Sequence, residues 1–190
     1  MIPLDDPIWD QLSCHNISGR EFAEILGEYY SGSIPADEDL EEDLLQCACG
    51  PDVYDSSVAA APHLVHLASK CSPSAAAIML RFAAIAIAEA ARDVDQFDPR
   101  LTVPLPEAAR IGEIEGRKAL ESPELDETAR DDMELSLLAL SGDHAGYWQE
   151  LEKMWAELPA TVTVLTAPPP RINVSWGSDQ SSSYTFNSGQ

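Results

Sequence analysis

Basic side chains are scarce in this 190-residue sequence. Lys and Arg together number 11 against 33 Asp and Glu, which leaves a formal net charge of −22. This shortage argues against a protein that binds nucleic acid or anionic membranes through a basic surface. Four cysteines are too few for a disulfide scaffold of this size, and the N-terminus has neither the basic nor the apolar region of a secretory signal. We therefore expect a cytoplasmic protein with reduced thiols.

Long uninterrupted hydrophobic runs are also missing. The most apolar stretch, 75–91, contains two charged residues, which favours a buried helix over a membrane span. Hydrophobic residues nonetheless make up 45% of the chain, which is enough for a core. Residues 159–190 hold one base and one acid, so the whole excess of acid lies in residues 1–158. This shift in composition predicts a domain over 1–158 and a separate tail over 159–190.

Apolar residues at helical spacing dominate residues 1–158. Ser18 and Glu21 form a capping box, and the apolar residues that follow recur at three- and four-residue intervals until Gly32. Other segments show the same kind of pattern, and several open with a capping residue followed by proline. The predicted helices cover 6–12, 18–31, 37–47, 56–69, 72–91, 107–121, 122–141 and 145–158, with 94–106 as a connecting loop.

About eight helices joined by short loops predict an all-α fold, either a closed bundle or an α-solenoid. Pairing the helices gives units near 18–49, 55–93 and 105–141. Their spacing is about the 40–47 residues of HEAT-type antiparallel helix pairs, so we favour a short solenoid. No strand pattern is evident before residue 160. In 159–190, alternating β-branched residues around a triple proline predict either a small β-hairpin or an irregular tail.

One segment resembles a group of bacterial HEAT-like proteins. Residues 50–68 read Gly-Pro-Asp-Val-Tyr-Asp-Ser-Ser-Val-Ala-Ala-Ala-Pro-His-Leu-Val-His-Leu-Ala. This sequence is similar to a segment of that group in which a glycine and Val-Tyr precede an alanine-rich helix with an internal Pro-x-Leu. In that group, as in this chain, an apolar helix follows. Residues 135–144 resemble its closing helix and small-residue turn, whereas Cys47-Ala48-Cys49 departs from the usual Cys-His-Gln. The resemblance covers about residues 5–158. It implies a HEAT-like helical fold, and some members of the group are thought to act as immunity or interaction proteins.

Two histidines have the residue type and spacing of a potential metal site. His63 and His66 lie three apart on one helical face, with Cys47 and Cys49 upstream, so a small metal-dependent or thiol hydrolase is one alternative. However, Cys-x-Cys is tighter than the usual metal-binding spacing, and a second cysteine pair is missing. We therefore expect histidines packed at a repeat interface, with neither a metal nor another cofactor.

Catalytic motifs are also missing from the sequence. Cys14 and His15 are neighbours, but a nucleophile and its base need a third group that orients the base, so we predict a surface pair. The chain has no phosphate-binding glycine loop, no Gly-x-Ser-x-Gly and no His-Glu-x-x-His. We expect a protein without catalytic residues. Gly112 and Gly116 predict instead a place where two helices approach closely.

A run of acids is the strongest functional indication. Six of the seven residues in 37–43 are acidic: Asp37, Glu38, Asp39, Glu41, Glu42 and Asp43. Acids near a helix N-terminus are favourable by themselves, but that does not explain the surplus across 1–158. We predict that this face, with Tyr54 as a further contact, binds a basic protein partner. An immunity-type inhibitor that covers a basic toxin or nuclease domain fits this prediction. Besides the hydrolase, the other alternative is a scaffold or regulatory subunit that binds a neutral partner through its tail.

Overall fold

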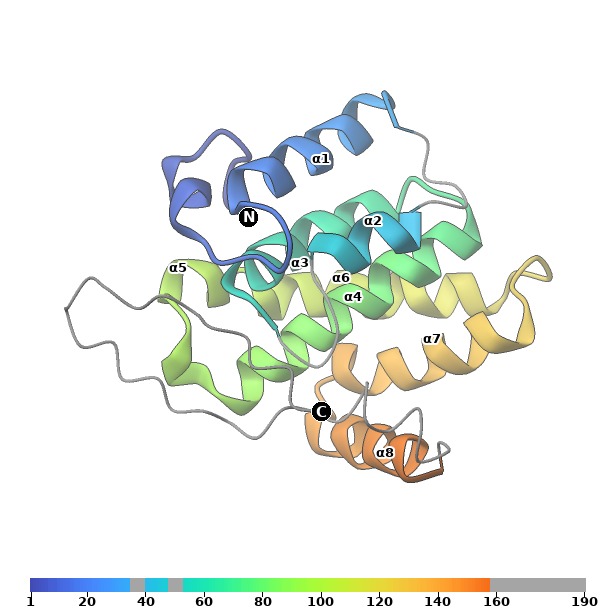
Figure 1. The fold of residues 1–190 in the computed structure, drawn as a ribbon. Coiled ribbons are helices and arrows are strands. Elements are labelled where there is room, and N and C mark those ends of the chain that lie inside the picture. Colours follow the sequence, from blue (N-terminus) through green and yellow to red (C-terminus); the bar gives the residue numbers. More distant parts are fainter. Residues whose placement is uncertain (35–39, 48–52, 158–190) are drawn as a thin grey trace, which may run out of the picture.

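The computed structural model describes residues 1–34, 40–47 and 53–157, and within them every regular element is helical, which confirms the all-α prediction. The predicted tail, 159–190, lies outside the described residues. In chain order the elements are η1 (Pro7–Gln11), α1 (Gly19–Ser31), α2 (Leu40–Cys47), α3 (Asp55–Ala68), α4 (Pro73–Arg92), η2 (Val94–Gln96), α5 (Pro99–Thr102), α6 (Leu105–Leu120), α7 (Glu127–Leu140) and α8 (His144–Glu157), where η denotes a 3-10 helix (Figure 1).

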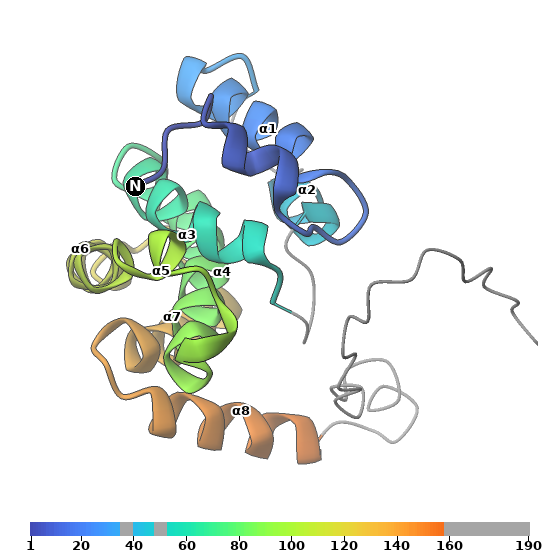
Figure 2. The same cartoon turned by 90° about the vertical axis from the view of Figure 1, so that its left-hand side faces the viewer.

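Helix α4 is the centre of the packing. It contacts α3, α6 and α7 extensively and α2 and α8 less so. Helix α3 also packs on α1 and on α6, so α1, α3 and α6 lie in one layer and α2, α4 and α7 in a second (Figure 2). In both views α1 and α8 lie at opposite ends of this stack, and α8 packs on α7.

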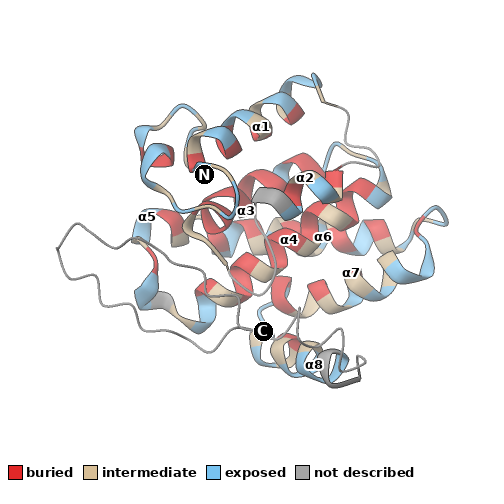
Figure 3. Ribbon diagram, viewed as in Figure 1, coloured by how far each residue is buried: buried red, intermediate tan, exposed pale blue. Residues whose placement is uncertain are grey.

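The burial of α4 follows from its composition. It is apolar on nearly every side, and Figure 3 shows most of it buried. By length and composition alone it could cross a membrane, since an 18-residue window has a mean hydropathy of 1.6, but 67% of that window is buried inside the protein. Core helices of this kind need no polar face, because neighbouring helices surround them.

The glycines of α6 allow the close helix approach that their spacing predicts. A Cβ added at Gly112 would lie 2.9 Å from Cδ2 of Leu140, and one at Gly116 would lie 2.9 Å from Sδ of Met133. Both contacts are shorter than real Cβ atoms show. Helix α7 therefore packs directly on the backbone of α6.

Local signals set most helix ends as predicted. The side chain of Ser18 accepts a hydrogen bond from the backbone N–H of Glu21, and the carboxylate of Glu21 accepts one from the backbone N–H of Ser18, so the capping box before α1 is confirmed. Gly32 ends α1 with a φ of 72°, a left-handed conformation that glycine adopts without strain. Ser72 likewise caps α4 by accepting from the N–H of Ala75.

Two predicted boundaries are wrong. Helix α7 does not start at Ser122; Asp126 is its cap and accepts a hydrogen bond of 2.8 Å from the N–H of Ala129. The preceding turn is held by the guanidinium of Arg130, which donates to the carbonyls of Leu120 and Ser122. The predicted loop 94–106 contains η2, α5 and the start of α6, because Asp98 followed by proline caps another short helix.

Candidate functional site

The acidic residues of α2 have different roles within the fold. Glu41 pairs with Arg81 of α4, and Asp43 accepts a hydrogen bond of 2.8 Å from the hydroxyl of Tyr29 in α1. Glu42 is exposed to solvent. The other three predicted contact residues, Asp37, Glu38 and Asp39, lie outside the described residues. Two of the three described acids therefore hold α2 in place as well as carrying charge.

Arg81 joins the acids of α2 to those of α7. Its guanidinium pairs with Glu41 and, at 2.8 Å, with the carboxylate of Asp132. Burial disfavours the charged form of Arg81, but its hydrogen bonds to the two carboxylates outweigh burial and raise its pKa. Because one guanidinium reaches both carboxylates, the acidic residues of α2 and α7 flank the same stretch of α4.

A second acidic segment runs from the end of α6 into α7. Its exposed members are Glu121, Glu124, Asp126, Glu127, Asp131 and Glu134. The base in this segment, Arg130, faces inward and donates to backbone carbonyls, so it leaves the carboxylates unneutralised. We call these six residues the α6–α7 acidic segment. Our sequence analysis missed it, although a count of charges in 121–134 would have found it.

Every Lys and Arg side chain in the described part of the chain has an intramolecular partner. Lys70 lies over the ring of Tyr30, 5.4 Å from its centroid, and Arg130 binds carbonyls. The others form ion pairs with Asp or Glu: Arg20, Arg81, Arg92, Arg100, Arg110, Arg117, Lys118 and Lys153. Because acids far outnumber these bases in 1–34, 40–47 and 53–157, most of the surplus carboxylates there have no basic group from the same residues beside them.

Tyr54 lies at the start of α3, half-buried. Its hydroxyl is 3.2 Å from Nδ1 of His15, and the two rings are 5.8 Å apart. The neighbouring backbone N–H of Ser56 donates to the carbonyl of Ser13 at 3.1 Å. Tyr54 thus anchors the segment after η1 to the beginning of α3, and His15 of the predicted surface pair is exposed as expected.

His63 is buried under the N-terminal segment. Its Nε2 lies 2.8 Å from the carbonyl of Ile2, so this nitrogen donates, and Nδ1 is free to accept from the hydroxyl of Tyr30 at 3.2 Å. Burial lowers the pKa of His63 to about 4, helped by the N-terminal ammonium and His66 and opposed by the hydrogen bond to Ile2. The neutral ring is a structural anchor in the packing of α3 against α1.

The two histidines of the hydrolase alternative differ in exposure. His66 is exposed, whereas His63 is buried, and the rings of both lie beside Tyr30. Cys49 and the side chain of Cys47 lie outside what the structure describes. Among the described residues, no group of three or more His, Cys, Asp or Glu side chains is arranged to hold a metal ion.

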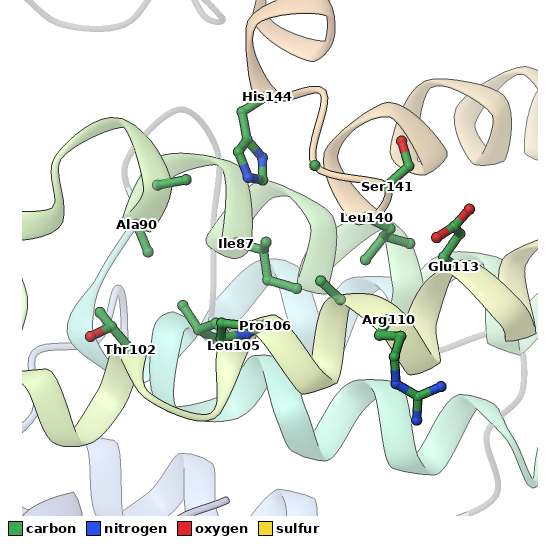
Figure 4. Close-up of a pocket in the computed structure, with 13 residues that line it drawn as sticks. Ile87, Ala90, Thr102, Leu105, Pro106, Arg110, Glu113, Leu140, Ser141 and His144 are labelled. Atoms are coloured by element: carbon green, nitrogen blue, oxygen red, sulfur yellow. The ribbon is translucent and has the colours of Figure 1, made fainter.

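A cavity of about 510 Å³ opens between α4, α6 and the turn from α7 to α8. Ile87, Leu105 and Leu140 contribute to its apolar wall, and the imidazole of His144 points into it (Figure 4). The sequence offered no signal for this cavity, because its wall combines residues from position 87 to position 144.

No protein-family model, no curated protein and no solved structure matches the chain. We therefore infer a function from the charges, contacts and burial of the chain itself.

Proposed function

We propose that this protein is a non-catalytic protein-binding module whose partner presents a basic surface. One observation carries the proposal: the bases of the described residues are engaged within the chain, while a large surplus of carboxylates is left at the surface. Repulsion among these carboxylates destabilises the isolated protein, and a basic partner would relieve it. The same field would also accelerate association with such a partner.

The binding surface that we propose combines two acidic regions. One is the predicted run on and before α2, with Glu42 exposed and Glu41 held by Arg81. The other is the α6–α7 acidic segment, where Arg130 faces inward. We group the two regions because Asp132 of α7 and Glu41 of α2 pair with the same guanidinium, that of Arg81. A cationic substrate cleft of a toxin or nuclease is the kind of surface that this arrangement suits, so an immunity-type inhibitor of a cytoplasmic bacterial toxin is our specific form of the proposal.

We also propose that the helix pairs form a short HEAT-like solenoid. The predicted units near 18–49, 55–93 and 105–141 correspond to α1–α2, α3–α4 and α6–α7. Their first helices pack in sequence, α1 on α3 and α3 on α6, and so do their second helices, α2 on α4 and α4 on α7. This order of contacts supports stacked repeats, because in a solenoid each pair packs mainly on its neighbours.

The test is capture of partners from the source organism at low and high salt, followed by mass spectrometry. One variant replaces Glu124, Glu127 and Glu134 with glutamine; the control replaces Glu24, Glu28 and Asp5 with the corresponding amides, which removes the same number of exposed charges near the N-terminus. We expect basic partners that are lost at high salt and lost with the first variant only. Capture of partners that are not basic, or capture that is equal at low and high salt, would refute the proposal.

Removing residues 159–190 tests the alternative in which the tail is the binding element. We expect the shortened chain to capture the same basic partners in nearly the same amount. Complete loss of capture by a shortened protein with an unchanged helical circular dichroism spectrum would favour the tail instead.

A further inference from the structure

The central helix α4 presents one stripe of residues to solvent. Between residues 75 and 90 its partly exposed residues are Ile78, Arg81, Ile85 and Glu89, and Figure 3 shows the rest of this span buried. They recur at three- and four-residue intervals, so they share one face of the helix. We call these four residues the α4 stripe. The most buried helix of the protein therefore still has a face that another molecule can contact.

The middle of the α4 stripe carries carboxylates that can accept further hydrogen bonds. Arg81 pairs with Oε1 of Glu41 in α2 and with Oδ2 of Asp132 in α7. Among the described residues, the second oxygen of each carboxylate accepts no other hydrogen bond. The side chain of Glu41 is 46% exposed, so a base from another molecule can reach it. Two carboxylates around one guanidinium leave negative charge here, which favours a lysine or arginine of a partner.

Apolar side chains adjoin these carboxylates. Leu45 follows Glu41 by one turn on the same face of α2, and it is 40% exposed. Ile78 and Ile85 lie one turn before and one turn after Arg81, and both are partly exposed while they pack on the core. The two isoleucines are seven residues apart, or about 10.5 Å along the helix. Apolar residues at positions i and i+7 of an amphipathic partner helix have the same spacing.

A surface that combines apolar and acidic groups in this way suits an amphipathic basic helix. We propose that the partner docks such a helix along the α4 stripe, with its apolar side chains on Leu45, Ile78 and Ile85 and a lysine or arginine on Glu41. This inference rests on the proposed function, to which it adds that the basic surface of the partner is helical. Charge alone attracts basic proteins of many kinds, whereas apolar contacts at this spacing select among them.

The first experiment compares two peptides of the same composition in calorimetric titrations of the full-length protein. The probe repeats the heptad Leu-Lys-Ala-Ala-Leu-Lys-Ala three times, which places its leucines on one face of a helix. The control peptide keeps the lysine positions but exchanges leucines with alanines, so that its leucines lie all around the helix. We expect the probe to bind about tenfold more tightly, because it alone can bury its leucines on the α4 stripe. Equal affinities would overturn this inference, while partner capture would still decide the proposed function.

A matched pair of substitutions then locates the probe. Leu45→Gln removes an exposed apolar side chain beside Glu41, and Ile114→Gln removes one of similar exposure, 44%, from α6 in the other layer of helices. Leu45→Gln should weaken the probe about fivefold and leave the control peptide unchanged, whereas Ile114→Gln should change neither. Equal effects of the two substitutions on the probe would place it elsewhere and overturn the inference.

Two other occupants of the α4 stripe would give different results. If a second copy of the chain covers it, the protein alone will sediment as a dimer that Leu45→Gln dissociates. If the tail covers it, removal of residues 159–190 will strengthen binding of the probe. Either result would overturn the inference. A monomer that binds the probe equally well with and without residues 159–190 would support it.

Discussion

Protonation of His63 should lower the stability of the protein in mildly acidic solution. The folded state holds this ring neutral, with Nε2 donating to Ile2 and Nδ1 beside the hydroxyl of Tyr30, and its pKa falls from 6.5 to about 4. The unfolded chain therefore binds a proton at a higher pH than the folded one. Stability linked to His63 is fully present above pH 6.5 and is lost as the pH falls toward about 4.

The expected size follows from these two values. Between pH 7 and pH 5 the different proton affinities of the unfolded and folded states reduce the free energy of unfolding by about 2 kcal/mol through His63 alone. His63→Gln removes the titration, and its amide can still donate to the carbonyl of Ile2. The variant should therefore lose about 2 kcal/mol less than the natural protein over the same pH interval.

Urea unfolding at pH 7 and pH 5, followed by circular dichroism, measures this difference. His66→Gln is the control, because His66 is an exposed histidine on the same helix. Its pH dependence should resemble that of the natural protein. If His63→Gln and the natural protein lose equal stability between pH 7 and pH 5, the buried neutral ring is not the cause and the reasoning fails.

Three further expectations concern packing and the ends of helices. Gly116→Ala should destabilise the protein by about 1–3 kcal/mol, since the new Cβ meets Sδ of Met133. Gly27→Ala, where a Cβ has room, should stabilise it by about 0.5–1 kcal/mol. Urea midpoints equal to that of the natural protein would contradict both expectations. Arg81→Met should cost about 2 kcal/mol in calorimetric unfolding, because it leaves two carboxylates without their shared cation; an unchanged melting temperature would show that this bridge is not stabilising. Ser18→Ala should cost about 1 kcal/mol by removing the cap of α1, and the same urea measurement would refute this if the midpoint did not move.

The elements that could be predicted from the sequence are those set by neighbours along the chain. The capping box at Ser18 and the end of α1 at Gly32 depend on groups within a turn of each other, so their pattern is visible in the sequence. The false start at Ser122 shows the limit. A serine before proline is a good helix start, but carbonyl bonds from Arg130 stabilise a turn there and move the start to Asp126.

The candidate sites were less accessible to sequence analysis. The run in 37–43 is contiguous and was therefore found, whereas the α6–α7 acidic segment is interrupted by other residues. Arg81 pairs with Glu41, which lies 40 positions before it, and with Asp132, which lies 51 positions after it. Only the packing of α2 and α7 on α4 reveals this bridge. The cavity beside His144 is equally invisible, because it forms only where α4, α6 and the α7–α8 turn meet.

Chain order exposes α4 to a hazard during synthesis. The ribosome releases this apolar helix before α6 and α7, which cover much of it in the finished protein, have been made. For that interval the nascent chain displays a segment that could cross a membrane by length and composition alone. The acids that precede α4 in the sequence should keep this intermediate soluble and repel it from anionic lipid headgroups. The same carboxylates would therefore reduce aggregation of the nascent chain before the folded protein binds a partner.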